Sequence, residues 1–236
     1  MPGNGPQDDT RRTAPAAEAR QRRAPLTRAR VVELALAIID REGLDALTIR
    51  RLAAAAGVKP MSLYHHFRSK EEILDDVAEA IAAAAVGLPP TDADWRDKVR
   101  FLFTGLHLLV REHPRALPLI STGVVRSASG RRWMEALMSA LLAAGFTPDQ
   151  AAAVYHALGA YTLGLGYAGL LPLDLPADAI VGQLVGHWGD YPNLLRVGLR
   201  LTEWDRPGEF EAGLDVLLSN FASELAGRQG PVTEDP

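Results

Sequence analysis

The chain has 236 residues, of which 47% are hydrophobic and 23% charged, a composition typical of globular proteins with a sizeable core. It contains no Cys, which excludes disulfides and thiolate metal sites and fits the cytoplasmic location that we expect. Residues 1–70 carry 13 Arg and Lys against seven Asp and Glu, whereas residues 71–236 carry 12 against 22, so a basic segment that can approach phosphates precedes an acidic one.

Residues 1–25 are rich in Gly, Pro, Ala and Arg and lack the apolar core of a secretory signal, which predicts a disordered tail. Its Arg side chains fit two roles, contact with DNA phosphates or a minor groove, or simple solvation. They are Arg11, Arg12, Arg20, Arg22 and Arg23.

The first predicted helix runs from Thr27 to Glu42 and ends at Gly43. Its apolar stripe consists of Val31, Leu34, Ala35, Ile38 and Ile39.

Two short helices joined by a tight turn are predicted next. Thr48 is a suitable N-cap, and Leu52 and Ala56 recur at helical spacing. Gly57 falls where the chain must leave this helix, a position that often requires positive φ. Pro60 suits the first turn of the following helix, where its missing N–H is not needed.

Leu63 and Phe67 are spaced to hold this second helix inward, which leaves its opposite face exposed. That face carries Lys59, Met61, Ser62, Tyr64, His65 and His66. A short exposed helix after a tight turn is the geometry that enters a DNA major groove. The alternative is an ordinary helical hairpin, which the positive charge of this segment disfavours.

Ser69 to Glu72 form a predicted capping box for a third helix, which stacks Ile73, Val77 and Ile81 and is expected to reach Val86. We interpret its acidic side chains as a solvated face rather than a metal site: Glu71, Glu72, Asp75, Asp76 and Glu79. Residues 26–86 are therefore predicted to form one domain. Gly87-Leu88-Pro89-Pro90 separates it from a second domain at 91–227, and 228–236 are predicted as a flexible tail.

The second domain is predicted to be helical throughout. We expect helices from Trp95 to Glu112 and from Arg131 to Ala144, the latter closed by Gly145. Thr147 to Gln150 can cap a further helix, and the last helix is expected at 209–226.

Residues 151–173 contain no Asp, Glu, Lys or Arg, a length that could span a membrane. Because His156, three Tyr, Pro172 and repeated Gly are unfavourable in a span, we interpret the segment as a helix buried on all sides, partly against a second subunit. Its small residues would permit close helix approach there: Gly159, Ala160, Gly164 and Ala168.

The order LTIRRLAAAAGV at 47–58, then SLYHHFRSKEEIL at 62–74, resembles the N-terminal domain of the tetracycline-repressor (TetR) family, with a match over residues 28–82. Tyr191-Pro192 and residues 209–218 resemble the C-terminal domain of members close to the tetracycline repressor itself.

This resemblance implies an all-α fold. An N-terminal three-helix bundle with a helix-turn-helix would precede a larger C-terminal helical domain for ligand binding and dimerisation. It further implies a homodimer through the helices near 148–168 and 209–226. A twofold pair would read two half-sites of a palindromic operator roughly 34 Å apart. The expected function is a transcriptional regulator, foremost a repressor, that is released by a mostly apolar small molecule.

Roles at DNA follow from position and chemistry. Phosphate contacts are predicted for Thr48, Tyr64, His66 and Lys70. Base-edge contacts are predicted for Arg50, Lys59, Met61, Ser62 and His65. Tyr64 fits equally a supporting role beneath the recognition helix.

An effector pocket is implied by the resemblance and by aromatic walls with a few polar tips. The candidates are Phe103, His107, Trp133, Met134, Met138, Tyr155 and Tyr161, each of which fits an ordinary core position as well. His107 and His113 lie six residues apart, on different helix faces, so neither a metal nor a cofactor is expected. This departs from the namesake repressor, which binds its drug with a metal ion.

Enzymatic motifs are lacking: there is no nucleophile elbow, phosphate loop or paired zinc ligand. The main alternative to a regulator is a helical interaction or ligand-carrying protein that does not read DNA sequence. A third possibility is an enzyme with an unrecognised site in the acidic domain.

Overall fold

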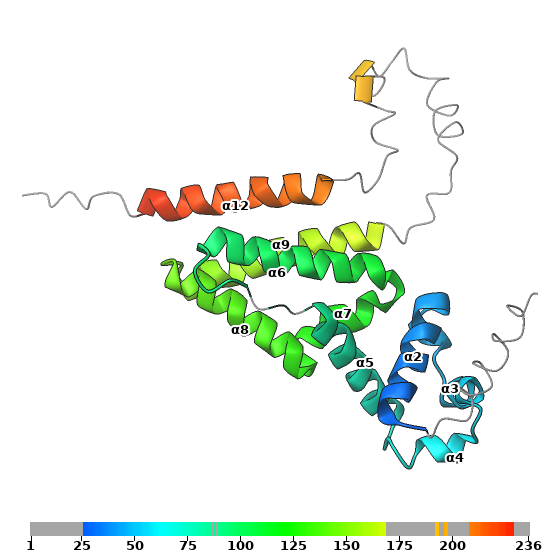
Figure 1. The fold of residues 1–236 in the computed structure, drawn as a ribbon. Coiled ribbons are helices and arrows are strands. Elements are labelled where there is room, and N and C mark those ends of the chain that lie inside the picture. Colours follow the sequence, from blue (N-terminus) through cyan, green and yellow to red (C-terminus); the bar gives the residue numbers. More distant parts are fainter. Residues whose placement is uncertain are drawn as a thin grey trace, which may run out of the picture. The chain divides into compact units, whose positions relative to one another are not determined.

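The computed structural model describes residues 26–85, 87, 89–168, 192–193, 196–197 and 208–228. Among these residues every regular element is a helix, as the sequence predicted (Figure 1). The chain divides into two compact units, Met1–Val77 (unit 1) and Ala78–Pro236 (unit 2), and the division falls inside helix α5, Lys70–Ala85. The domain limits inferred from sequence, near residues 86 and 91, stay predictions. The predicted tails, except Arg228, and Tyr191 lie outside the described residues.

Unit 1 contains α2 (Arg28–Glu42), the 3-10 turn η1 (Leu44–Ala46), α3 (Ile49–Ala56), α4 (Pro60–Leu63) and the start of α5. The predicted N-cap Thr48 is confirmed, because its hydroxyl accepts the Arg51 N–H at 3.2 Å. Thr27, which the sequence placed inside the first helix, is the N-cap of α2, and its hydroxyl accepts the Arg30 N–H at 3.2 Å. The apolar positions of these helices form one buried core: Val31, Ala35, Ile38, Ile39, Leu52, Leu63, Phe67, Ile73 and Val77.

Gly57 ends α3 in the left-handed conformation, with φ of 68°, as expected. Nothing lies within 4 Å of the place where a Cβ would stand, so any cost of substitution is conformational. We predict that Gly57→Val destabilises unit 1 by about 1–2 kcal/mol, because a β-branched residue strains this backbone. Gly57→Asn, which tolerates the conformation, should cost less. Faster amide hydrogen exchange in α2 and α3 measures the effect. Equal exchange in the two variants would contradict this explanation.

Unit 2 contains α6 (Trp95–Glu112), the 3-10 turn η2 (Pro114–Ala116), α7 (Leu117–Arg126), α8 (Ala128–Ala143), α9 (Pro148–Ala168) and α12 (Glu209–Arg228). The bounds of α6 were predicted correctly. The sequence interpretation missed η2 and α7, whose Pro residues lie in their first turns. It also began α8 three residues late, at Arg131, because Ser127 is the true cap and its hydroxyl accepts the Gly130 N–H at 2.9 Å.

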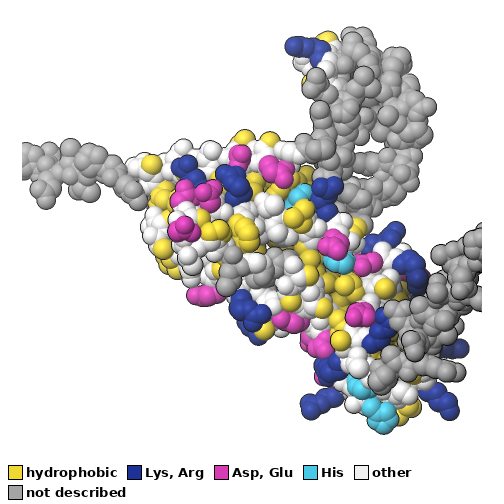
Figure 2. Space-filling model, in the orientation of Figure 1, with side chains coloured by type: hydrophobic (Ala, Val, Ile, Leu, Met, Phe, Trp, Pro, Cys, Tyr) yellow, Lys and Arg dark blue, Asp and Glu magenta, His cyan; other side chains and the backbone are white. Residues whose placement is uncertain are grey.

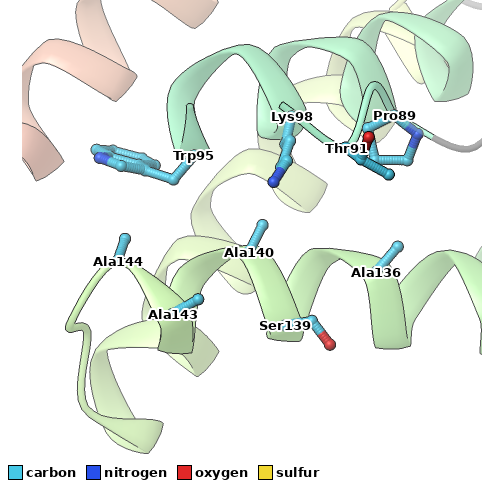
Figure 3. A pocket seen from close by; sticks show the side chains of 9 residues that line it. All are labelled: Pro89, Thr91, Trp95, Lys98, Ala136, Ser139, Ala140, Ala143 and Ala144. Atoms are coloured by element: carbon cyan, nitrogen blue, oxygen red, sulfur yellow. The ribbon is translucent and has the colours of Figure 1, made fainter. Parts of the chain in front are cut away.

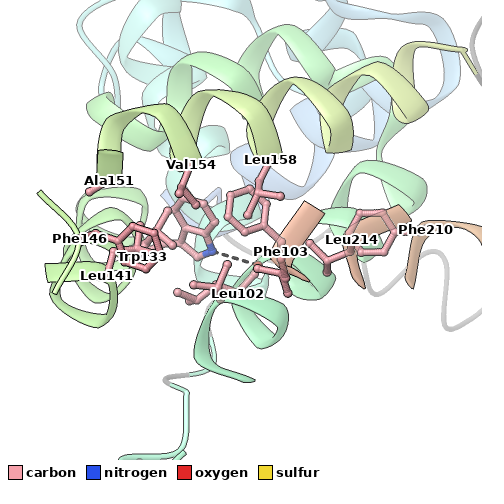
Figure 4. Close-up of a cluster of buried hydrophobic side chains, with 13 residues drawn as sticks. Leu102, Phe103, Trp133, Leu141, Phe146, Ala151, Val154, Leu158, Phe210 and Leu214 are labelled. Carbon is pink, nitrogen blue, oxygen red and sulfur yellow. Dashed lines mark hydrogen bonds between the residues drawn. The ribbon is translucent and has the colours of Figure 1, made fainter. Parts of the chain in front are cut away.

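The core of unit 2 joins α6, α8, α9 and α12 (Figure 4). Phe103 and Trp133 meet edge to face, with ring centroids 5.3 Å apart. The indole N–H of Trp133 donates to the Leu102 carbonyl at 3.2 Å, which satisfies a buried polar group. Around this pair lie Val99, Leu137, Leu141, Phe146, Val154, Leu158, Phe210, Leu214 and Leu218.

In the single chain α9 is buried on one face, and the expected burial of its other face against a second subunit stays a prediction. One face of α9 packs inward through Ala151, Val154, Leu158 and Thr162. The opposite face is exposed, and its members are Ala153, His156, Ala160, Gly164 and Tyr167. No described helix is long and apolar enough to cross a membrane, whereas residues 169–173 of the charge-free segment lie outside the described residues.

Helix α12 approaches α9 closely at Gly213. A Cβ at this position would overlap the Tyr161 hydroxyl, which donates to the carbonyls of Glu209 and Phe210 at 3.2 and 3.3 Å. At the start of α9 the predicted capping box is complete: Thr147 Oγ1 accepts the Gln150 N–H at 3.3 Å, and Gln150 Oε1 accepts the Thr147 N–H at 2.9 Å. The Tyr161 hydroxyl therefore holds the first turn of α12 against α9, while the capping box fixes the start of α9 alone.

Candidate nucleic-acid interface and effector domain

The turn between α3 and α4 follows the predicted helix-turn-helix. The Gly57 and Val58 N–H groups donate to Ala54 and Ala53 carbonyls at 3.1 and 3.0 Å, which closes α3. Pro60 then starts α4, which has only four residues before it continues as a turn to Phe67. Leu63 and Phe67 are 1% and 2% exposed, so this short segment is held by its inner face, as expected.

Most of the predicted base-contacting side chains, which lie on α3, on α4 and next to α4, are exposed to solvent. Met61 is 71% exposed, and Arg50, Lys59 and His65 are also exposed, whereas Ser62 is half-buried. Figure 2 shows His, Lys and Arg side chains on the surface over this part of unit 1. The exposed set supplies cationic donors for guanine and an apolar contact for a thymine methyl.

The predicted phosphate contacts differ in exposure. Thr48 is exposed, and because its oxygen accepts the Arg51 N–H, its own hydroxyl hydrogen is still available for a phosphate. Tyr64 is 47% exposed, which leaves its hydroxyl accessible. His66 and Lys70 are half-buried. All four stay predicted DNA contacts.

Sequence reasoning missed Arg28. This residue links the start of α2 to the end of the α4 segment, which comprises α4 and the turn that follows it, residues 60–67. Its Nη1 donates to the His66 carbonyl at 2.6 Å and to Glu72 at 2.9 Å, and its Nη2 donates to Asp76 at 2.8 Å. The guanidinium also lies 4.3 Å from the centroid of the Phe67 ring. These partners are 38 to 48 residues away in sequence, so local patterns gave no signal for them.

The capping box at the start of α5 is only half as predicted. Ser69 Oγ accepts the Glu72 N–H at 3.3 Å, but the Glu72 carboxylate accepts the Arg68 N–H at 2.6 Å rather than that of Ser69. The Arg68 N–H and the Arg28 guanidinium hold the pKa of Glu72 below its usual value, so this carboxylate stays ionised at neutral pH. The interpretation of the acidic residues as a merely solvated face is therefore wrong for Glu72 and Asp76.

Glu79 is also bound, in this case within unit 2. Its carboxylate accepts the Ser129 N–H at 3.0 Å and the Ser129 hydroxyl at 2.6 Å, while Arg132 donates to the same hydroxyl at 2.7 Å. The hydrogen bonds from Ser129 lower the pKa of Glu79. Through this contact the end of α5 is tied to the first turn of α8. Among the described residues, no group of three or more His, Asp or Glu could hold a metal ion.

The residues predicted for an effector pocket lie in or against the core of unit 2. Phe103, Trp133 and His107 are buried, and the His107 ring stacks on Phe210 with centroids 3.9 Å apart. The others are partly buried against the same core: Met134, Met138, Tyr155 and Tyr161. They are thus brought together, and their role toward an effector stays a prediction.

Two family models match the chain. Residues 31–77 match the family of bacterial regulatory proteins named after TetR, and residues 88–223 match the tetracyclin repressor-like C-terminal domain. Tetracycline repressor class C from Escherichia coli is 31% identical over 83% of this chain and 90% of its own length. An HTH-type transcriptional regulator from Saccharopolyspora erythraea is also 31% identical, and this chain spans 59% of that protein's length.

Solved structures agree with this assignment. ActR from Streptomyces coelicolor in complex with actinorhodin has a TM-score of 0.71 and 27% identity, over 85% of this chain and 97% of its own. BioQ with its double-stranded DNA operator has a TM-score of 0.54 and 26% identity, over 82% and 99%.

The helix-turn-helix, the helical second unit and these matches define a DNA-binding transcriptional regulator. The chain belongs to the TetR family, with a tetracycline repressor-like C-terminal domain.

Proposed function

We propose that this regulator is a repressor that binds a palindromic operator as a homodimer and leaves it when a small molecule binds unit 2. The observation that carries the proposal is the α4 segment: Leu63 and Phe67 are buried while Lys59, Met61 and His65 face solvent beside a net positive charge. Because DNA is its target, we also propose a cytoplasmic location.

Base reading is assigned to Arg50, Lys59, Met61, Ser62 and His65, and phosphate binding to Thr48, Tyr64, His66 and Lys70. A bidentate contact from Arg50 or Lys59 to guanine would contribute about 1–3 kcal/mol of discrimination. Phosphate contacts fix register without reading sequence.

The dimer is proposed to form through the exposed faces of α9 and α12. The α9 face carries no charged side chain beyond Asp149, and the α12 face contributes Ala212 and Val216, the latter 69% exposed. Small side chains permit close helix packing, which a four-helix interface between two copies requires. A pair of recognition helices then supplies contacts that one helix lacks.

Release is proposed to act through α5. This helix buries Ile73 and Val77 in unit 1, while Ala78 and Ile81 belong to unit 2 and Glu79 is bound to α8 through Ser129. A mostly apolar effector among the predicted pocket residues would shift α8, and with it α5, toward a state that binds DNA weakly. Its coupling free energy equals its differential affinity for the two states, typically about 1–3 kcal/mol. The solved complex of ActR with actinorhodin supports a small-molecule ligand for this chain as well.

Selection of bound sequences from a random duplex library tests the DNA part of the proposal. We expect one palindrome to be enriched by the chain and lost in the double variant Arg50→Ala, Lys59→Ala, since base contacts carry the preference. Lys70→Ala is the matched control. It should lower the affinity for all duplexes about equally and still enrich the palindrome. Its affinity should depend less steeply on salt concentration, by the amount expected for one lost phosphate contact.

Binding without enrichment would contradict the proposal. Phosphate attraction alone would then explain the basic segment, and the alternative of a helical interaction or ligand-carrying protein would be favoured.

A further inference from the structure

A groove in unit 2 is lined by none of the residues predicted for the effector pocket. It separates the segment 89–91 and the first turn of α6 from the last turns of α8, and its volume is about 570 Å³ (Figure 3). Pockets for small molecules have volumes of roughly 300–1,000 Å³, so this groove is large enough for one.

The floor of the groove is narrow and apolar. Ala136, Ala140 and Ala143 recur on one face of α8 and point into it. Ala143 lies seven residues after Ala136, or about 10 Å along the helix at 1.5 Å per residue. Trp95 bounds one end, and an edge contact with Phe146, centroids 4.9 Å apart, holds its ring in place. Side chains that stop at Cβ along a straight helix form a trough suited to an extended hydrocarbon chain.

The charge in the groove comes from Lys98. Figure 3 shows its side chain directed across the groove toward Ala140. Among the described residues that line the groove, Lys98 is the only charged one, and no described carboxylate lies within 4.0 Å of its ammonium. An ammonium over an apolar floor is complementary to an anionic group at the end of an apolar chain.

We propose that this groove binds an unbranched aliphatic carboxylate. The hydrocarbon chain lies along the alanines of α8 and against Trp95, and the carboxylate pairs with Lys98. The site is separate from the predicted effector pocket, and ligand binding here does not require that the protein recognise an operator.

Isothermal titration of the full chain with octanoate and 1-octanol tests the site. Octanoate is expected to bind more tightly than the alcohol. Lys98→Met should weaken octanoate binding about tenfold, the loss of one charge-assisted hydrogen bond, and leave 1-octanol unchanged. Arg111→Met is the matched control, since it removes the same charge from an exposed residue of α6 that does not line the groove, and it should retain octanoate affinity.

A second variant tests the floor without disturbing the core. Ala143 is exposed, so Ala143→Trp fills the groove and should abolish octanoate binding, with an unchanged melting curve as the check on folding. Equal losses of octanoate affinity in Lys98→Met and Arg111→Met would mean that only long-range attraction by the positive charges is at work, and this result would overturn the proposal. Octanoate binding that survives in Ala143→Trp, or no binding to the unmodified chain, would overturn it too. None of these results depends on DNA binding.

Discussion

Combining Glu72→Gln with Asp76→Asn is expected to weaken operator binding by about tenfold, or about 1.4 kcal/mol, although two negative charges are removed. Simple electrostatics predicts the opposite, since a less acidic unit 1 attracts phosphates better. The expected loss arises because the two carboxylates hold Arg28, which in turn binds the His66 carbonyl and covers Phe67. Without them the α4 segment loses a support at its C-terminal end.

The double substitution should change the position of the α4 segment more than it changes the stability of unit 1. The Arg28 side chain is 45% exposed, and those of Glu72 and Asp76 are 33% and 34% exposed, so solvent screens these ion pairs and they contribute little to the free energy of unfolding. Operator affinity should therefore fall while the melting temperature changes little. The affinity for random duplex and its salt dependence should not decrease, because no phosphate contact is lost.

The matched control is Glu33→Gln combined with Asp45→Asn, which removes two exposed carboxylates from the same unit without touching Arg28. Titration of the selected palindrome and of a scrambled duplex, at one salt concentration, measures both variants. The control should bind both duplexes as well as or better than the parent chain. If the Glu72 and Asp76 variant binds the palindrome as tightly as this control does, the positioning role of Arg28 is refuted.

Charge placed in the proposed dimer faces is expected to have the largest effect on operator binding. Ala160→Glu with Val216→Glu should convert a dimer to monomers and reduce operator affinity by about a hundredfold or more, since burying unpaired like charges costs several kcal/mol. A monomer also contacts only one half-site. Both positions are exposed in the single chain, so each subunit should fold normally.

Sedimentation velocity gives the oligomeric state, and titration of the selected palindrome gives the affinity. Leu108→Glu is the control, because Leu108 is 57% exposed on α6, outside the proposed faces. It should stay dimeric and bind the palindrome. A dimeric Ala160 and Val216 variant would show that the copies associate elsewhere.

The local structure of unit 1 could be predicted because its determinants lie within a few residues of one another. Thr48 caps the N–H of Arg51, and Gly57 adopts positive φ immediately after α3. The bounds of α6 were also predicted correctly, because they too depend on residues that lie close together in sequence. The same approach predicted no helix between Glu112 and Arg131, so it missed η2 and α7, whose first turns contain Pro114 and Pro118, although Pro is suited to a first helical turn.

The sequence alone thus determined the helical class, the caps and turns of the helix-turn-helix, and the resemblance of this motif to the TetR family. Only the tertiary structure decided which partners the acidic residues of α5 take, since Arg28 and Ser129 lie 44 to 50 residues from the carboxylates that they bind. It likewise decided that the predicted effector residues gather in one core and that Lys98 faces a trough of alanines on α8. Hydrogen bonds between near neighbours leave a periodic signature in a sequence, whereas contacts between distant segments depend on how the helices pack.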